Sequence, residues 1–334
     1  MCTVVVWGDN GQAVVSSRNM DWFESMETEL WVLPAGREVN GAGVGDPKPL
    51  KWTSKYGSVI ASAYNIGTAD GMNEKGLGAH MLWLSSSQYG ERDPEALGLD
   101  VSLWAQYYLD NFETVADAVA DYQAHPYQIV VADIAGREAT IHIQISDATG
   151  DIAVFESLNG KIVIHHGKQY TVLTNKPTFD EQLANLKNYK DFGGTEPLPG
   201  TTSAEDRFVR ATYYRDHLAA PATTEEALAG LLSVLRNAAQ PFGVPSPNQP
   251  NIAPTIWRAT LDHSNLGYFF ESTSSPYLIW LDLTKLDFSE GAPVKMLRLA
   301  EMADKIGEQN DALVDAELFE FSEPPETHPV VGDN

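Results

Sequence analysis

The hairpin predicted at the start of the chain constrains the fold most strongly. Residues 2–7 form a β-branched run that is typical of a buried strand, and residues 13–17 form a second run of this kind. The Asp-Asn-Gly sequence at 9–11 between them is a turn signal. Because the second strand returns antiparallel to the first, Arg18 and Asp21 are expected to lie beside the first residues of the chain.

Cys2 is the only cysteine of the chain and follows an initiator methionine. A residue this small at the second position permits removal of the methionine, which leaves a thiol and a free α-amine on one residue. These groups ordinarily titrate near ~8.5 and ~8, so one residue can supply a nucleophile and the base that activates it. An arginine favours the thiolate and a carboxylate orients the ammonium group, which gives Arg18 and Asp21 roles in the same site. The alternative is a buried structural cysteine with a surface ion pair.

Composition excludes several classes of partner. The 334 residues include 46 acidic and 22 basic side chains, and the net charge of −24 argues against nucleic acid and anionic membranes. No run of about 18 apolar residues predicts a membrane span, and no basic and apolar leader precedes the first strand. A single cysteine excludes an intramolecular disulfide and leaves the compartment open. We expect a periplasmic protein if an initiator methionine has replaced a signal peptide, and a cytoplasmic one otherwise.

Strands, then helices, then strands again are expected along the rest of the chain, which predicts an α+β protein with segregated layers in a single domain spanning residues 1–334. Helical patterns cover residues 99–122 with a break at Asp110-Asn111, and residues 180–190. Two further helices are expected to open at capping boxes, at residues 202–205 and 223–226. A proline cluster at 241–254 predicts an ordered loop or lid, and the acidic residues after about 305 a docked or frayed tail.

Other catalytic motifs are missing from the sequence. There is no H-E-x-x-H motif or cysteine cluster for zinc, no G-x-S-x-G elbow and no phosphate-binding glycine loop. His165 and His166 are adjacent in a predicted strand, so their side chains point to opposite faces. We therefore expect no metal and no cofactor, and the chemistry falls to the residues around Cys2.

Four separated segments carry a resemblance to a known family. They are Cys2 with Arg-Asn-Met-Asp at 18–21, Gly-Met-Asn-Glu-Lys-Gly-Leu-Gly at 71–78, Val-Leu-Thr-Asn-Lys-Pro-Thr-Phe-Asp at 172–180, and the helix opening at 203–210. The chain thereby resembles the choloylglycine hydrolase and penicillin V acylase family of N-terminal-nucleophile hydrolases. The matches span positions 2 to 207, and the last third of the chain is similar only in its strand pattern. The resemblance implies a four-layer αββα sandwich and a homo-oligomer, often a tetramer.

The resemblance also assigns catalytic roles. The side-chain amide of Asn175 and the backbone N–H of Trp83 match the donors of the family's oxyanion hole. Removing one such donor typically raises the barrier by ~2.7–4 kcal/mol. Arg18, Asp21 and Arg207 match the charged residues around the family's nucleophile. Each of these three alone could equally form a structural salt bridge.

Tryptophan at two positions narrows the expected substrate. Bile-salt hydrolases of the family have asparagine where Trp83 stands, whereas Trp83 together with Trp22 is similar to the penicillin V acylases of Gram-negative bacteria, which also hydrolyse N-acyl homoserine lactones. Met20, Trp22 and Trp83 are therefore expected to line an acyl pocket, with a core position as the alternative for either tryptophan. We expect a hydrolase of small N-acyl amides such as penicillin V, with bile-salt hydrolysis or a non-catalytic binding protein as the alternatives.

Overall fold

Two large β-sheets organise the computed structural model, which describes residues 2–43, 45–131, 133–134, 137–242 and 253–321. The first sheet has the strand order β16-β1-β2-β17-β18-β19-β21. Its strands are β1 (Cys2–Trp7), β2 (Val15–Asp21), β16 (Val172–Leu173), β17 (Thr255–Asp262), β18 (Gly267–Ser272), β19 (Ile279–Asp282) and β21 (Gly307–Glu308). The sheet therefore joins the beginning of the chain to residues more than 230 positions later, since Met20 pairs with Trp257.

The second sheet has the order β15-β14-β13-β8-β7-β6-β3-β20-β22. Its strands are β3 (Leu30–Leu33), β6 (Ser58–Ala63), β7 (Gly67–Asn73), β8 (Gly78–Trp83), β13 (Ile141–Ser146), β14 (Ile152–Leu158), β15 (Lys161–His166), β20 (Lys295–Leu297) and β22 (Val314–Asp315). Smaller pairs are β4 (Glu38–Asn40) with β5 (Lys51–Thr53), β9 (Leu97–Asp100) with β10 (Tyr127–Val130), and β11 (Asp133–Ile134) with β12 (Arg137–Glu138).

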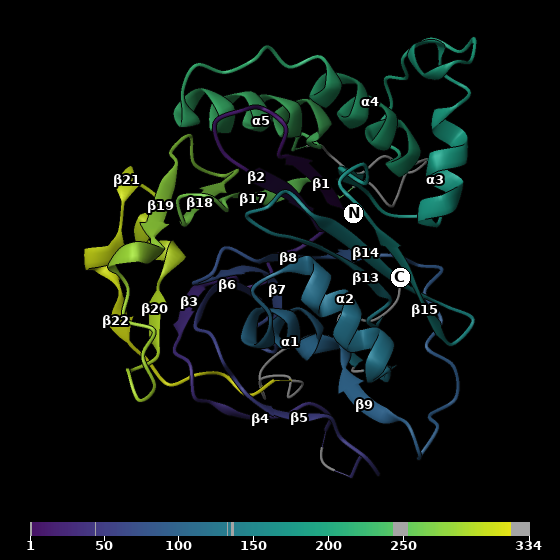
Figure 1. Cartoon of the computed structure of the whole chain (residues 1–334). Coiled ribbons are helices and arrows are strands. Elements are labelled where there is room, and N and C mark those ends of the chain that lie inside the picture. Colours follow the sequence, from purple (N-terminus) through teal and green to yellow (C-terminus); the bar gives the residue numbers. More distant parts are fainter. Residues whose placement is uncertain (1, 44, 132, 135–136, 243–252, 322–334) are drawn as a thin grey trace.

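Helices cover the outer faces of both sheets (Figure 1). They are α1 (Trp104–Asn111), α2 (Val115–Ala124), α3 (Phe179–Leu186), α4 (Ala204–Asp216) and α5 (Thr224–Ala238). Helices α4 and α5 pack on β1 and β2, and α1 packs on β7 and β8. Short 3₁₀ helices occupy Val101–Leu103, Lys190–Phe192, Leu283–Lys285, Leu299–Met302 and Asn310–Ala312. No helix in the described part of the chain is long and apolar enough to cross a membrane.

The predicted N-terminal hairpin is confirmed. Strands β1 and β2 pair antiparallel with Cys2 opposite Met20 and Val4 opposite Arg18. Every residue of both strands is buried, because helices cover one face and side chains of the second sheet cover the other. A strand buried on both faces reads as a continuous rather than an alternating pattern, as in the apolar run of β1.

Helix boundaries differ from the sequence expectations in three places. The helix expected from residue 99 begins at Trp104, because the chain before it forms the end of strand β9 and then the 3₁₀ helix Val101–Leu103. The break at Asp110-Asn111 is confirmed, since α1 ends at Asn111. The cap of α4 is Ser203 rather than Thr202, and its side chain accepts the N–H of Asp206. Helix α3 ends at Leu186 instead of residue 190, because the following backbone turns into a separate 3₁₀ helix. The proline cluster lies mostly outside the described residues.

Candidate active site

Cys2 lies at the start of β1, facing the second sheet, and is only 2% exposed. Its neighbours are set by the hairpin register. Met20 stands directly opposite, with its Sδ 3.7 Å from the Cys2 Sγ. Arg18 lies two positions further along on the same face and reaches back diagonally, so that its Nη2 donates to the Cys2 Sγ at 3.0 Å. The fully buried guanidinium therefore places its positive charge directly beside the sulfur.

Residues of β7 hold Arg18 from the opposite sheet. The carbonyl oxygen of Ala69 accepts its Nη1 at 2.8 Å, and Asp70 Oδ2 lies 3.8 Å from its Nε. The guanidinium also lies over the ring of Trp257, 5.0 Å from the ring centroid. A buried charge needs such compensation, and these contacts supply it.

Asp70 connects Arg18 to a buried polar chain between the two sheets. His80 Nδ1 lies 2.6 Å from Asp70 Oδ2, and the Tyr268 hydroxyl donates to Asp70 Oδ1 at 2.8 Å. The chain continues from His80 through Ser16 to His263, with contacts of 3.0 and 2.8 Å. Burial lowers the pKa of His263 to about 4. Sequence reasoning did not identify these residues, although Asp70 immediately precedes the Gly-Met-Asn-Glu motif.

The side chain of Asn175 links three parts of the site. Its Oδ1 accepts the Cys2 N–H at 2.6 Å and Arg207 Nη2 at 2.9 Å. Arginine can only donate, so the oxygen must face Arg207 and the Nδ2 must face the other way. That Nδ2 donates to the Trp83 carbonyl at 2.7 Å. An amide nitrogen carries two hydrogens, so a second Nδ2 hydrogen remains for another acceptor.

A buried histidine fixes the segment that carries Asn175. His142 Nε2 lies 2.8 Å from the carbonyl oxygen of Thr174, and His142 Nδ1 lies 2.9 Å from Glu156 Oε1. Glu156 also accepts the backbone N–H of Phe179 at the start of α3. Both sides of the loop after β16 are thereby attached to the second sheet, which sets the direction of the Asn175 side chain.

Strand alternation sets the direction of the Trp83 peptide groups. The Leu84 N–H donates to Thr140 on the β13 side at 2.9 Å. Because neighbouring residues of an antiparallel strand alternate in the side to which their N–H and C=O point, the Trp83 groups point away from β13. The pairing of β8 with β7 ends at His80, which lies before this position. The N–H and C=O of Trp83 therefore point to the same side of β8, where the C=O accepts a hydrogen bond from Asn175.

Arg207 on α4 is fully buried and donates to the first residues of β1. Its Nη1 lies 2.5 Å from both the Cys2 carbonyl oxygen and the Thr3 Oγ1, and 3.8 Å from Asp21 Oδ2. Burial lowers the pKa of Arg207, and the nearby charges of Asp21 and Cys2 oppose this effect.

Two residues from the last third of the chain hold Asp21. Thr255 Oγ1 donates to Asp21 Oδ1 at 2.5 Å, and Gln240 Nε2 donates to Asp21 Oδ2 at 3.0 Å. Both donors were missed from the sequence, because only the folded protein pairs β17 with β2 and bonds Gln240 to Thr255.

Both tryptophans predicted for the acyl pocket line a cavity of about 70 Å³ at Cys2, together with Met20, Met26 and Tyr64. The two indole rings lie 5.4 Å apart at 48°. Trp22 is fixed by its Nε1, which donates to the Tyr64 hydroxyl at 2.6 Å, and this hydroxyl donates to Glu24 at 2.7 Å. The cavity is almost entirely apolar, so it suits an apolar acyl group beside the sulfur.

The structure thus brings all the predicted site residues together around one thiol: Cys2, Arg18, Met20, Asp21, Trp22, Trp83, Asn175 and Arg207. Within the described ranges no group of three or more His, Cys, Asp or Glu side chains could hold a metal ion. The Cys2 thiol thus lies between polar donors on one side and an apolar cavity on the other.

Comparison with known proteins gives the class. Residues 2–296 match the family of linear amide C–N hydrolases, choloylglycine hydrolase family. The chain belongs to this family, which confirms the resemblance inferred from the four motifs and makes the protein a linear-amide hydrolase.

The sequence identity differs between individual members of the family. The chain is 42% identical to a penicillin V acylase from Pectobacterium atrosepticum, with 96% of this chain and 92% of that protein covered. It is 28% identical to a bile salt hydrolase/transferase from Bifidobacterium longum, with 65% of this chain and 74% of that protein covered. Among solved structures, penicillin V acylase from Agrobacterium tumefaciens matches with a TM-score of 0.87 and 46% identity, covering 96% of this chain and 99% of that one.

Proposed function

We propose that this protein hydrolyses the side-chain amide of penicillin V and the amide of N-acyl homoserine lactones, with Cys2 as the nucleophile. The observation that carries the proposal is the apolar cavity between Trp22 and Trp83 next to the Cys2 sulfur. An aromatic or alkyl acyl group in it would gain ~25 cal/mol for each Å² of apolar surface removed from water. The higher identity to the penicillin V acylase, 42% against 28% for the bile salt hydrolase, supports the same choice.

The proposed reaction begins once Met1 has been removed. The Cys2 nitrogen, which faces Asn175 Oδ1, is then a free amine that takes the thiol proton. The sulfur attacks the amide carbonyl, and the carbonyl oxygen becomes an oxyanion that accepts hydrogen bonds from Asn175 Nδ2 and the Trp83 N–H. The C–N bond then breaks as the ammonium group returns its proton to the leaving amine. Water, deprotonated by the same amine, cleaves the thioester and frees the acid.

The charged residues take supporting roles in this proposal. Arg18 stabilises the thiolate before attack, because its guanidinium is 3.0 Å from the sulfur. Arg207 donates hydrogen bonds to both the Cys2 carbonyl and the Asn175 oxygen. It therefore fixes the position of the nucleophile relative to the oxyanion donor. Asp21 balances the charge of Arg207. No step requires a metal or a cofactor.

We also propose that the chain forms one domain, residues 1–334, arranged as the four-layer αββα sandwich of the N-terminal-nucleophile hydrolases. Its two helix groups and two sheets lie in this order in Figure 1, which supports the proposal. The protein is expected to form a homo-oligomer, and we propose a tetramer because many members of the family are tetrameric. Light scattering coupled to gel filtration measures the mass of the assembly directly.

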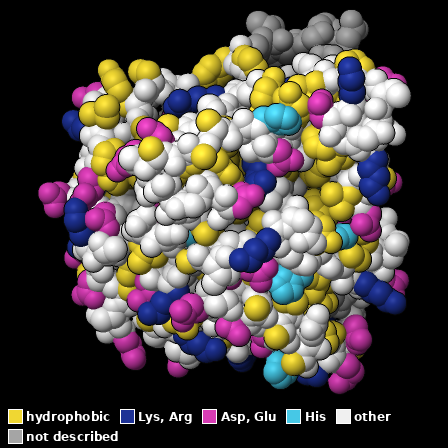
Figure 2. Space-filling model, turned by 45° about the horizontal axis from the view of Figure 1, so that its top comes forward, with side chains coloured by type: hydrophobic (Ala, Val, Ile, Leu, Met, Phe, Trp, Pro, Cys, Tyr) yellow, Lys and Arg dark blue, Asp and Glu magenta, His cyan; other side chains and the backbone are white. Residues whose placement is uncertain are grey.

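The charge distribution supports a small-molecule substrate rather than nucleic acid or a membrane. On the face shown in Figure 2, Lys and Arg side chains are scattered among acidic ones and form no continuous basic patch. Because the protein has a net charge of −24, it would repel a polyanion from most directions.

A substrate panel tests the proposal. Hydrolysis of penicillin V, of N-acyl homoserine lactones and of glycine-conjugated bile salts should be measured side by side, with Cys2→Ala as the inactive control. We expect turnover of the first two classes and little of the third, because two indoles narrow the slot that a steroid needs. Faster turnover of bile salts would assign the enzyme to that substrate class instead. No turnover of any compound by chains that have lost Met1 would favour a binding protein.

A further inference from the structure

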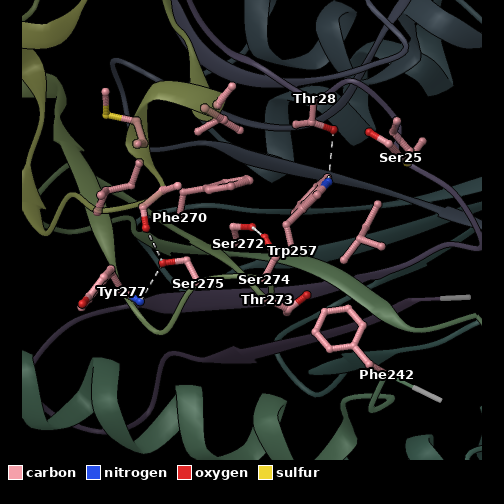
Figure 3. Close-up of a pocket in the computed structure, with 17 residues that line it drawn as sticks. Ser25, Thr28, Phe242, Trp257, Phe270, Ser272, Thr273, Ser274, Ser275 and Tyr277 are labelled. Carbon is pink, nitrogen blue, oxygen red and sulfur yellow. Dashed lines mark hydrogen bonds between the residues drawn. The ribbon is translucent and has the colours of Figure 1, made fainter.

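A second and larger hollow lies beyond Met26, with a volume of about 420 Å³ against about 70 Å³ for the cavity at Cys2. The first sheet forms its floor through Trp257, Phe270 and Ile279, which come from β17, β18 and β19. Figure 3 shows Trp257 turned toward Thr28, to whose hydroxyl its Nε1 donates at 3.1 Å. The hydrolysis proposed at Cys2 does not use this hollow.

One face of the first sheet connects the two spaces. Cys2 pairs with Met20, Met20 with Trp257, and Trp257 with Ser272 on successive strands β1, β2, β17 and β18. Cys2 and Met20 line the small cavity, whereas Trp257 and Ser272 line the large one. Strands lie ~4.8 Å apart, so this row covers roughly 14 Å from the nucleophile. The two spaces therefore lie next to each other along this face of the sheet.

Met26 is the residue shared by the walls of both spaces. Methionine is unbranched and adapts its side chain at low cost, so Met26 can yield to an alkyl chain that passes from one space to the other. The cavity at Cys2 has about one sixth of the volume of the large hollow. A long acyl group therefore gains most of its additional space beyond Met26.

The lining of the large hollow selects against charged ligands. The described residues that form it include no Lys, Arg, Asp, Glu or His. Several of its hydroxyl groups already have protein partners: Ser272 bonds Ser274 at 2.8 Å, Thr273 donates to Thr255 O at 2.5 Å and Ser275 donates to Ala303 O at 2.9 Å. Most of the surface that the hollow offers to a ligand is apolar, which suits an unbranched alkyl chain.

We propose that this hollow is a distal acyl-chain subsite, which receives the end of a long alkyl chain whose amide carbonyl lies at Cys2. The inference rests on the proposed function and deepens it, since it makes long-chain N-acyl amides preferred substrates. Trp257 adds a connection to the chemistry, because its indole contacts the alkyl chain in the hollow and also carries the Arg18 guanidinium 5.0 Å from the ring centroid.

Binding to an inactive protein tests the subsite. Calorimetric titration of Cys2→Ala with butanoyl, hexanoyl, octanoyl and dodecanoyl homoserine lactone should show affinity that rises at least ten-fold from hexanoyl to dodecanoyl. Adding Ala300→Phe, at an exposed alanine that lines the hollow, should abolish this rise and leave butanoyl binding within two-fold. Ser272→Phe, which lines the hollow from β18, should give the same result.

Ala229→Phe is the matched control. Ala229 is exposed on α5 and lines a different hollow, beside Phe269 and Trp280, so this substitution should keep the chain-length dependence. The proposal is overturned if dodecanoyl binds Cys2→Ala no better than hexanoyl, or if Ala300→Phe and Ser272→Phe leave the dependence unchanged. An equal loss for every chain length would also overturn it. Failure of the proposed function is a separate outcome, in which Cys2→Ala binds long chains but the parent protein hydrolyses none of them.

Discussion

The guanidinium of Arg18 donates to the sulfur of Cys2 at 3.0 Å, and both residues are closed to solvent. The β1–β2 register produces this contact, since it places the two residues on one face of adjacent strands. The positive charge of Arg18 is placed to stabilise the sulfur, which must become an anion to react.

Replacing Arg18 should therefore slow the thiol. We expect Arg18→Gln to lower kcat/KM for penicillin V by about ten-fold or more, taking ~1.4 kcal/mol of lost charge stabilisation per decade. The rate of Cys2 alkylation by iodoacetamide at pH 7 should fall with it. Arg18→Lys keeps the charge and should retain more of the alkylation rate than Arg18→Gln. Equal alkylation rates in all three proteins would exclude a role for this charge.

Removal of the Asp70 carboxylate should weaken the fold through Arg18. Asp70→Ala leaves a fully buried arginine with less compensation, and breaking such a pair typically costs ~3–5 kcal/mol. The free energy of unfolding in urea measures the loss. Glu308→Ala, at a carboxylate paired with Lys285 at 2.6 Å on the surface, is the comparison and should cost far less. A similar small loss in both variants would contradict the importance of the buried chain.

Asn175 is expected to act in the transition state. Asn175→Ala removes an oxyanion donor and should lower kcat by roughly 10²–10³, with a smaller change in KM. The steady-state constants for penicillin V separate these effects. A change confined to KM would show that Asn175 only binds the substrate.

The two tryptophans should control affinity for the acyl group. Trp83→Ala and Trp22→Ala should each raise KM for penicillin V and for long-chain homoserine lactones by roughly ten-fold or more, because each indole covers one wall of the cavity. Trp22→Phe keeps an aromatic ring but loses the hydrogen bond to Tyr64, so its KM should lie between those of Trp22→Ala and the parent. Unchanged KM values in both alanine variants would remove the indoles from the substrate pocket.

His263 should make stability depend on pH. Burial lowers its pKa from 6.5 to about 4 in the folded protein, so the unfolded chain binds the proton more readily. Its stabilising contribution is present above pH 6.5 and is lost as the pH falls toward 4. The full loss is about 3 kcal/mol, from 1.36 kcal/mol per pKa unit. Urea unfolding between pH 7 and 4 should show a shallower dependence in His263→Gln, and identical slopes would contradict the assignment.

The sequence predicted those parts of the site that depend on local structure or on a motif. Cys2, Arg18 and Asp21 lie on one hairpin, whose turn and strand pattern are legible in the first twenty-two residues. Asn175 and Trp83 lie far apart along the chain, and the resemblance of their segments to the family supplied them. Their mutual contact at 2.7 Å is visible only in the fold.

The residues that support the site were not predictable in this way. Thr255 reaches Asp21 because β17 pairs with β2, and no local pattern encodes a pairing over more than 230 positions. Gln240 follows α5 and is held beside Asp21 by its backbone hydrogen bonds with Thr255. Asp70 and His80 are polar residues within buried strands, where a periodicity argument expects core side chains. Their role becomes visible only when the second sheet covers the first.

The most direct test of the account is the intact mass of the protein, rapidly quenched during turnover of penicillin V. We predict that molecules lacking Met1 gain the mass of one phenoxyacetyl group, which peptide mapping places on Cys2, whereas molecules retaining Met1 gain none. Acylation of chains that keep Met1, acylation at another residue, or normal turnover by Cys2→Ala would contradict the claim that the thiol and amine of Cys2 perform the hydrolysis.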